Sequence, residues 1–304
     1  MSEAVGVQAD LAEQERALSE GVGAVVRRID VVDVTGEQAV KFLDGQLSQD
    51  ISAIATGSSA WSFVLQPQGK VVALVRVTVI GPEVVLLDTD LGFGSILVER
   101  LNRFRLRVKA ELSHREVDAV SVRGPAAADL PRPAGLVLDS LWPDWPGWDQ
   151  LEATDAPDGV AACSIEAWEA TRIRAGLPRN GADLTDKTIP AESGLVPISA
   201  SMTKGCYVGQ ELVARIDSRG HVNRHLRRLE VRGSVPPPGA ELVHLDKPVG
   251  TVSSSAFSQL AGQPVALGYV RREVDAGAVV QVKWPEGAAD ATVLGAAVHG
   301  PTER

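Results

Sequence analysis

The sequence is poor in cysteine and in long apolar runs. Its 304 residues include two cysteines, Cys163 and Cys206. Two thiols cannot hold an iron–sulfur cluster or a structural zinc ion within one chain, nor form a disulfide framework. No stretch approaches the roughly 18 apolar residues of a membrane span, and the N-terminus lacks the basic-then-apolar order of a signal peptide. We therefore expect a cytoplasmic globular protein with no intrinsic metal and no membrane partner.

Basic residues are also in short supply. Lys and Arg number 30 against 39 Asp and Glu, giving a net charge of -9 at pH 7. This charge disfavours general attraction to nucleic acid, so any anion site must be local. One local cationic cluster stands out, consisting of Arg215, Arg219, His221, Arg224, His225, Arg227 and Arg228. Such a cluster is compatible with a small anionic ligand, with an RNA backbone, or with exposed ion pairs that contribute little.

The hydrophobic pattern predicts an α+β region followed by a small β-barrel. Residues 1–20 are polar with little periodicity, which indicates a flexible or helical arm. Residues 21–228 mix strand and helix periods, with a helix from Ser164 to Gly176 and a loop rich in proline, glycine and tryptophan at 125–160. We expect this region to form two interleaved subdomains with antiparallel sheets. Residues 229–304 contain short β-like runs between glycine and proline turns, a pattern typical of a barrel.

The most informative segment is Lys-Gly-Cys-Tyr-Val-Gly-Gln-Glu at residues 204–211. Gly209 permits a sharp turn, and an amphipathic helical pattern follows it. Cys206 is thereby placed just ahead of a helix N-terminus, where free amides, the helix dipole and the charge of Lys204 favour a thiolate. We predict that Cys206 is a functional thiol; the alternative is a small buried structural cysteine. The other candidate site residues of this segment are Gly205, Tyr207, Gln210 and Glu211.

Further short segments form a recognisable order with this cysteine motif. They lie at residues 36–50, 67–70, 176–178, 190–195, 247–254 and 266–270. Together they resemble the YgfZ family of folate-binding proteins, relatives of the glycine-cleavage T-protein, over roughly residues 25–285. The resemblance implies a T-protein-like α+β fold with a C-terminal β-barrel, and tetrahydrofolate or a derivative as the bound cofactor.

The same resemblance implies a function. It is that of a folate-binding accessory protein for the assembly or repair of iron–sulfur proteins, with a link to tRNA modification. Cys206 would then lie near a tetrahydrofolate cleft, and the partners would be folate and iron–sulfur proteins or their assembly factors. By resemblance, Arg174 stands where the T-protein branch has a pterin-contacting glutamate. Arg227 belongs to the cluster in which that branch places an arginine against the acidic tail of folate.

Two other functions stay open, and with them the question of whether the protein is an enzyme. The first is a folate-dependent aminomethyltransferase. The T-protein branch carries an aspartate for the one-carbon unit on the strand after its hairpin turn, which residues 67–70 resemble. Here the following residues, 71–75, contain no carboxylate. This departure, together with Arg174, argues against the transferase. The second is a non-catalytic RNA- or protein-binding module that uses the cluster between Arg215 and Arg228, whose binding would depend steeply on salt.

Overall fold

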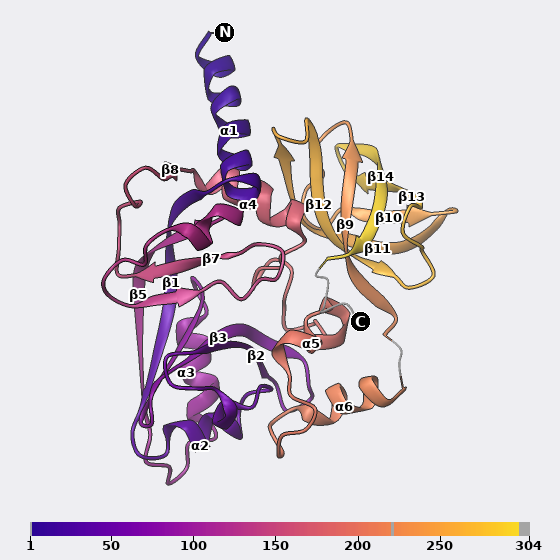
Figure 1. The fold of residues 1–304 in the computed structure, drawn as a ribbon. Coiled ribbons are helices and arrows are strands. Elements are labelled where there is room, and N and C mark those ends of the chain that lie inside the picture. Colours follow the sequence, from indigo (N-terminus) through magenta and orange to yellow (C-terminus); the bar gives the residue numbers. More distant parts are fainter. Residues whose placement is uncertain (1, 220–221, 298–304) are drawn as a thin grey trace.

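The computed structural model describes residues 2–219 and 222–297 (Figure 1). An eight-stranded sheet forms the N-terminal part, with strand order β2-β3-β4-β1-β5-β7-β6 and β8 paired to β1. Its strands are β1 (Gly23–Thr35), β2 (Ser59–Leu65), β3 (Val71–Gly81), β4 (Val84–Asp90), β5 (Glu111–Arg123), β6 (Val137–Asp139), β7 (Gly147–Leu151) and β8 (Ala161–Ala162). All of these pairings are antiparallel except the short one between β1 and β8.

Six α-helices accompany the strands in the described part of the chain. They are α1 (Ser2–Glu20), α2 (Ala39–Asp44), α3 (Gly94–Asn102), α4 (Ile165–Ala175), α5 (Val196–Ser199) and α6 (Gln210–Arg219). Helix α1 projects from the body of the molecule, and α4 lies between the sheet and the barrel (Figure 1). Within the described residues, no helix has the length and apolar character needed to cross a membrane.

The C-terminal part is a closed barrel with strand order β10-β11-β12-β9-β14-β13. Its strands are β9 (Arg224–Arg232), β10 (Glu241–His244), β11 (Lys247–Ser258), β12 (Gln263–Arg271), β13 (Val279–Trp284) and β14 (Gly287–Ala296). The barrel thus begins at Arg224, a few residues before the boundary at 228 that the sequence pattern suggested. Along β9, Leu229 and Val231 belong to the barrel core, whereas Leu226 packs in a separate cluster with Ile173 and Tyr269. The arginines between these apolar residues make the strand look like a polar charge run in the sequence.

The predicted fold class is confirmed: the protein is α+β, with antiparallel sheets, helices and a C-terminal barrel. The segment 125–160, expected as a loop, instead contributes β6 at one edge of the sheet and β7 between β5 and β6. The predicted helix of residues 164–176 is also present. The Ser164 hydroxyl accepts a hydrogen bond from the Ala167 amide at 3.2 Å, and Gly176 ends the helix with a φ of 82°.

Strand β3 shows how the sheet separates a hydrophobic core from the functional side. Its side chains alternate, because successive residues of a strand point to opposite faces. Ala73, Val75 and Val77 are buried against α2 and α3 in one core. Leu74 belongs to the opposite core, with Trp145 and Trp168. Leu74 and the next residue on that face, Arg76, also line the cavity described below.

Candidate functional site

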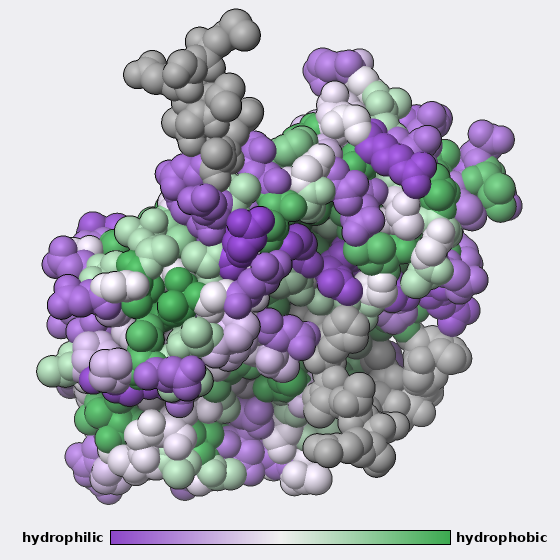
Figure 2. Space-filling view, turned by 45° about the horizontal axis from the view of Figure 1, so that its top comes forward, coloured by the Kyte–Doolittle hydropathy of each residue, from purple (hydrophilic) through white to green (hydrophobic). Residues whose placement is uncertain are grey.

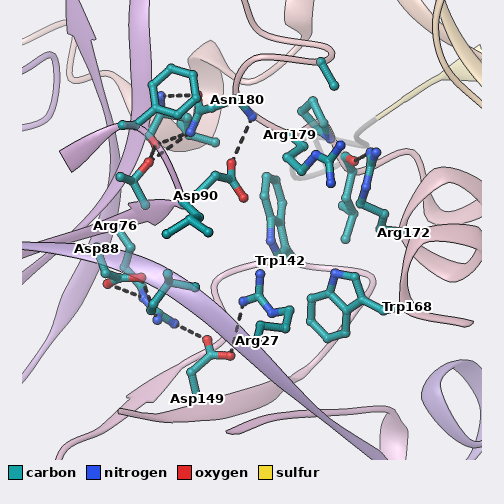
Figure 3. Close-up of a pocket in the computed structure, with 18 of the residues that line it drawn as sticks. Arg27, Arg76, Asp88, Asp90, Trp142, Asp149, Trp168, Arg172, Arg179 and Asn180 are labelled. Carbon is teal, nitrogen blue, oxygen red and sulfur yellow. Dashed lines mark hydrogen bonds and ion pairs between the residues drawn. The ribbon is translucent and has the colours of Figure 1, made fainter. Parts of the chain in front are cut away.

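A cavity of about 660 Å³ opens between the sheet, helix α4 and the loop at residues 177–182 (Figure 3). Hydrophilic residues also gather on the surface where the sheet region meets the barrel (Figure 2). The cavity lining is rich in tryptophan and in charge. Its aromatic and charged members are Trp61, Trp142, Trp145, Trp168, Phe93, Arg27, Arg28, Arg76, Arg123, Arg172, Arg179, Asp88, Asp90, Asp149 and Glu169.

The aromatic wall consists of two tryptophan pairs. The ring centroids of Trp61 and Trp142 lie 4.7 Å apart, and those of Trp145 and Trp168 lie 4.4 Å apart. Both pairs are tilted. Trp145 and Trp168 are buried in the core, whereas the half-buried rings of Trp61 and Trp142 suit stacking against a planar ligand. The indole nitrogen of Trp145 donates to the Leu18 carbonyl at 2.7 Å, which anchors this wall to α1. The indole nitrogen of Trp61 is buried and has no hydrogen-bond partner among the described residues.

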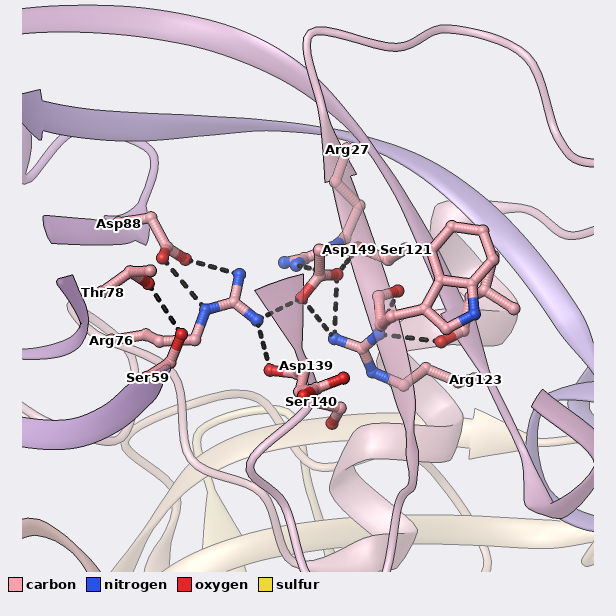
Figure 4. A network of polar contacts seen from close by, with 12 residues as sticks. Arg27, Ser59, Arg76, Thr78, Asp88, Ser121, Arg123, Asp139, Ser140 and Asp149 are labelled. Carbon is pink, nitrogen blue, oxygen red and sulfur yellow. Dashed lines mark hydrogen bonds and ion pairs between the residues drawn. The ribbon is translucent and has the colours of Figure 1, made fainter. Parts of the chain in front are cut away.

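Beneath the aromatic wall lies a buried ion network (Figure 4). Arg76 binds Asp88 through two hydrogen bonds of 2.9 and 3.0 Å and reaches Asp149 at 2.7 Å. Arg123 binds both oxygens of Asp149, at 2.9 and 3.0 Å, and the Ser121 hydroxyl donates to the same carboxylate at 2.5 Å. Burial opposes ionisation of Asp149, but the surrounding arginines outweigh it and hold the pKa of this carboxyl far below its ordinary value.

Asp90 is the carboxylate of β4 that this network leaves available. Its Oδ2 atom accepts the Asn180 amide at 2.9 Å, and the carboxylate faces the cavity (Figure 3). Burial raises the pKa of Asp90 above its ordinary value, against the opposite effects of the Asn180 amide and nearby arginines. The Asn180 side chain pairs with the backbone of Leu74, at 2.8 and 2.9 Å, and so fixes the loop against β3. Asp90 is therefore a preorganised carboxylate in a partly desolvated site.

The sequence-based reasoning missed Asp90. The only signal was the alternation of Asp88 and Asp90 at the end of a strand, which also fits a solvated strand terminus. As the sequence indicated, β3 offers the cavity no carboxylate, because its cavity-facing residues are Leu74 and Arg76. The carboxylates come instead from β4, which pairs directly with β3.

The cysteine motif lies elsewhere. Cys206 is exposed and does not line this cavity. The Lys204 ammonium, on a side chain that is 1% exposed, donates to the carbonyls of Asp44, Leu47 and Gln49 at 2.6 to 3.1 Å. Burial lowers the pKa of Lys204, although the Asp44 carboxylate at 3.2 Å acts in the opposite direction. This charge holds the 44–49 backbone together, whereas the sequence suggested that it would stabilise a thiolate.

Gly209 has a steric role. At a φ of 85°, an added Cβ would lie 2.6 Å from the Gln66 carbonyl oxygen and 2.8 Å from the Leu65 Cβ. Gly69 of the hairpin turn is equally tight, since its Cβ would lie 2.5 Å from that of Leu212. The hairpin turn and the cysteine motif therefore pack glycine to glycine. This contact explains why both segments need glycine.

The rest of the motif also serves the local fold. Tyr207 is buried in the core beside Leu65 and Val213. The Gln210 side-chain oxygen accepts the Tyr207 amide at 3.0 Å, which closes the turn into α6. Gly205 and Glu211 are exposed. None of these residues lines the cavity. The functional role of the Cys206 thiol stays a prediction.

The arginines proposed from the sequence are placed outside the cavity lining as well. Arg174 donates to the Ser19 hydroxyl at 2.8 Å, and Arg227 is half-buried on β9. Arg224 forms a two-pronged ion pair with Glu192 at 2.9 and 3.1 Å, so its charge is neutralised within the fold. His221 and the Arg219 side chain lie outside the described residues. The use of this cluster as an RNA- or protein-binding surface stays a prediction.

The cations that line the cavity instead include Arg27 of β1, Arg172 of α4 and Arg179 of the following loop (Figure 3). Arg172 contacts the Glu169 carboxylate at 2.7 Å and that of Asp183 at 3.0 Å. Across residues 2–219 and 222–297, no group of three or more His, Cys, Asp or Glu side chains could hold a metal ion.

Comparison with known proteins agrees with the architecture. Residues 224–298 match the family model of the glycine cleavage T-protein C-terminal barrel domain. The crystal structure of aminomethyltransferase T of the glycine cleavage system from Bartonella henselae superimposes with a TM-score of 0.79 at 19% identity, covering 94% of this chain and 88% of that one. The protein therefore has a T-protein-like fold.

Sequence relatives point to the same group. An aminomethyltransferase of Corynebacterium jeikeium is 25% identical over 82% of this chain and 79% of its own length. An uncharacterized protein of Haemophilus influenzae is 28% identical over 62% of this chain and 66% of its own length. A mitochondrial iron-sulfur cluster assembly factor IBA57 homolog of Mycosarcoma maydis is 27% identical, over 77% and 67%. The chain is thus related to the aminomethyltransferases and carries their C-terminal barrel.

Proposed function

We propose that this protein binds tetrahydrofolate or a derivative in the cavity beside β3 and β4, and supports the assembly or repair of iron–sulfur proteins. The observation that carries the folate part is the cavity itself. It places a half-buried carboxylate, Asp90, in the same space as paired tryptophans and arginines. The iron–sulfur part is supported by the resemblance of the cysteine motif and by the name of the Mycosarcoma maydis relative.

The residues present fit a folate. A reduced pterin has an edge rich in N–H groups, whose hydrogen bonds a carboxylate such as Asp90 can accept. It also has a flat ring that can stack on Trp142. The acidic tail of folate requires cations, which the cavity supplies. A volume of about 660 Å³ also lies within the usual range of roughly 300–1,000 Å³ for ligand sites. When bound, the folate would supply a carrier for one-carbon units, and these side chains would hold and orient it.

Aminomethyl transfer is the less favoured function. The strand after the hairpin turn presents Leu74 and Arg76 to the cavity, and Arg76 is committed to Asp88 and Asp149. A group on that strand which could accept or deliver a proton is therefore absent. The likeness to aminomethyltransferases supports a common ligand pocket. The residues of β3, however, argue that the bound folate does not take part in aminomethyl transfer.

A functional Cys206 would belong to a different surface. The thiol is exposed and lies outside the cavity lining, so it would meet a partner protein, such as an iron–sulfur protein or an assembly factor. In this proposal the folate and the thiol act at separate places on the molecule.

Calorimetric titration with tetrahydrofolate tests the ligand. We expect saturable binding to the wild-type protein, and a loss of about tenfold or more in Trp142→Ala, because stacking on an aromatic side chain contributes roughly 1–3 kcal/mol. Phe257→Ala is the matched control, since Phe257 is an exposed barrel residue outside the cavity. A wild-type titration without saturable heat would refute folate binding.

Complementation tests the biological role. In cells that lack the native protein, we expect the wild-type chain to restore iron–sulfur enzyme activity, and Cys206→Ala and Trp142→Ala to restore much less. Full restoration by Cys206→Ala would show that the thiol has no functional role. Full restoration by a Trp142→Ala protein that no longer binds folate would separate the folate from the iron–sulfur role.

A further inference from the structure

Five of the six arginines that line the cavity already have a carboxylate within hydrogen-bond distance of the guanidinium. These pairs are Arg28 with Glu116, Arg76 with Asp88 and Asp149, Arg123 with Asp149, Arg172 with Glu169 and Asp183, and Arg179 with Glu169. Arg27 is the exception among these six. Its Nη2 atom lies 3.8 Å from Asp149 Oδ1, which is too long for a hydrogen bond.

Arg27 is nevertheless held in a defined position. Its Nε atom donates to the Ser121 hydroxyl at 3.0 Å. Its guanidinium carbon lies 4.4 Å from the centroid of the Trp168 ring, a cation–π distance. The side chain is 22% exposed, and its guanidinium points into the cavity beside Trp142 and Trp168 (Figure 3). Both terminal NH₂ groups are left without a hydrogen-bond acceptor among the described residues.

The network behind Arg27 explains why its charge stays available. Asp149 already accepts hydrogen bonds from Arg76, Arg123 and Ser121, so it attracts Arg27 without bonding to it. Asp90 also attracts Arg27 through space, but no hydrogen bond joins them. A largely desolvated guanidinium with unused donors is unfavourable unless an anion binds them. The planar fork of an arginine matches a carboxylate in particular.

We infer that Arg27 is the specificity-determining residue of the cavity and binds a carboxylate of the ligand through its two terminal NH₂ groups. The identity of the ligand rests on the proposed function: in a folate, the carboxylates are those of the glutamyl tail. Arg27 would then distinguish complete folates from pterins that lack this tail.

The test compares two ligands on three variants. Tetrahydrofolate carries the tail, and tetrahydropterin does not. We expect Arg27→Met to weaken tetrahydrofolate binding about 10- to 100-fold, as for the loss of a charged hydrogen bond, and to change tetrahydropterin binding less than twofold. Arg27→Lys should give an intermediate loss for tetrahydrofolate. Arg271→Met, which removes an exposed arginine paired with Glu273, should change neither affinity.

Equal losses for both ligands, or no loss for either, would overturn the inference. Urea unfolding of Arg27→Met checks that the variant is folded before its affinities are compared. A third ligand, 4-aminobenzoyl glutamate, separates this inference from the proposed function, because it carries the carboxylates without the pterin. If tetrahydrofolate fails to bind but this fragment quenches tryptophan fluorescence saturably in the wild type and not in Arg27→Met, the anion site stands and the folate proposal falls. If neither compound binds the wild-type protein, both fall.

Discussion

Two largely buried cations, Arg27 in the cavity and Lys204 in the cysteine motif (residues 204–211), show how differently two parts of this molecule use charge. The Lys204 ammonium donates hydrogen bonds to three backbone carbonyls and to the Asp44 carboxylate, so its donors are all used within the fold. Arg27 has one hydrogen bond, to Ser121, and keeps its terminal NH₂ groups directed into the cavity. A cation whose donors are all used stabilises the fold; one with donors left over is placed to bind a ligand.

The two parts also differ in how they are assembled. The cysteine motif is one continuous segment, residues 204–211, and it packs against the hairpin turn through glycine contacts. The cavity collects side chains from β1, β2, β3, β4, β5, β7, α4 and the 177–182 loop. Loss of a counter-charge in the cavity network should therefore cost more than any change at the cysteine itself.

The largest effect is expected for Asp149→Ala. This change leaves Arg76 and Arg123 buried without a shared counter-charge, and we expect the free energy of unfolding to fall by about 3–5 kcal/mol. Urea unfolding followed by tryptophan fluorescence measures it. Asp158→Ala, at an exposed loop position, is the control and should change stability by less than about 0.5 kcal/mol. A similar small effect for Asp149→Ala would mean that the network is not a stabilising unit.

Next comes Gly209→Ala in the cysteine motif. The new methyl group would clash with Gln66 and Leu65 at a positive φ, so we expect a loss of about 2–3 kcal/mol in the free energy of unfolding. Gly57→Ala is a matched control, because Gly57 has a φ of 82° but open space around its Cβ position. It should lose only about 1 kcal/mol. Equal losses would show that backbone strain, and not the contact with the hairpin turn, makes glycine necessary.

Asp90→Asn should act in the opposite direction on stability. Because the pKa of Asp90 is raised in the folded state, ionising this carboxyl lowers the free energy of unfolding. The loss is absent below the ordinary pKa of 3.8, which applies to the unfolded chain, and it develops as the pH rises through the pKa of the folded state. We expect the variant to be more stable at pH 7 by about 0.5–2 kcal/mol, and the gain to shrink toward pH 4. The amide can still accept the Asn180 N–H.

The same variant should bind tetrahydrofolate about tenfold more weakly, because it loses a charged acceptor. Urea unfolding at the two pH values and calorimetry at pH 7 give both readouts. A variant that is less stable at pH 7 but binds normally would make Asp90 a structural residue.

The smallest effect is expected for Cys206→Ser. Because the side chain is exposed and outside the cavity, stability should change by less than about 0.5 kcal/mol and tetrahydrofolate affinity by less than about twofold. Fast alkylation by iodoacetamide at pH 8 should disappear in this variant. The remaining thiol, Cys163, is half-buried, and burial raises its pKa to about 11, so it should react slowly. A large loss of folate affinity would bring the cysteine back into the ligand site.

The helices and strands of this protein could be predicted from the sequence where residues close together in the chain determine them. Ser164 and Gly176 bound a helix because a cap and a left-handed terminator act on their own turns. The short runs after residue 228 predicted a barrel because alternation and turn residues are local signals. The resemblance of the cysteine motif also pointed to the right fold. Gly209 of this motif packs tightly on Gly69 of the hairpin turn, so the glycines of both segments are needed by one and the same tertiary contact.

Only the tertiary structure decided which charges face a ligand. Arg27, Asp90 and Asn180 are unremarkable in the sequence, and they meet because β1, β4 and the loop after α4 converge on one cavity. Lys204 looked like a cation placed to stabilise the Cys206 thiolate, yet its ammonium binds three backbone carbonyls and the Asp44 carboxylate of a distant segment. Local periodicity determines helices, strands and turns, but whether a charge is satisfied depends on partners brought together by long-range packing, and no local pattern records them.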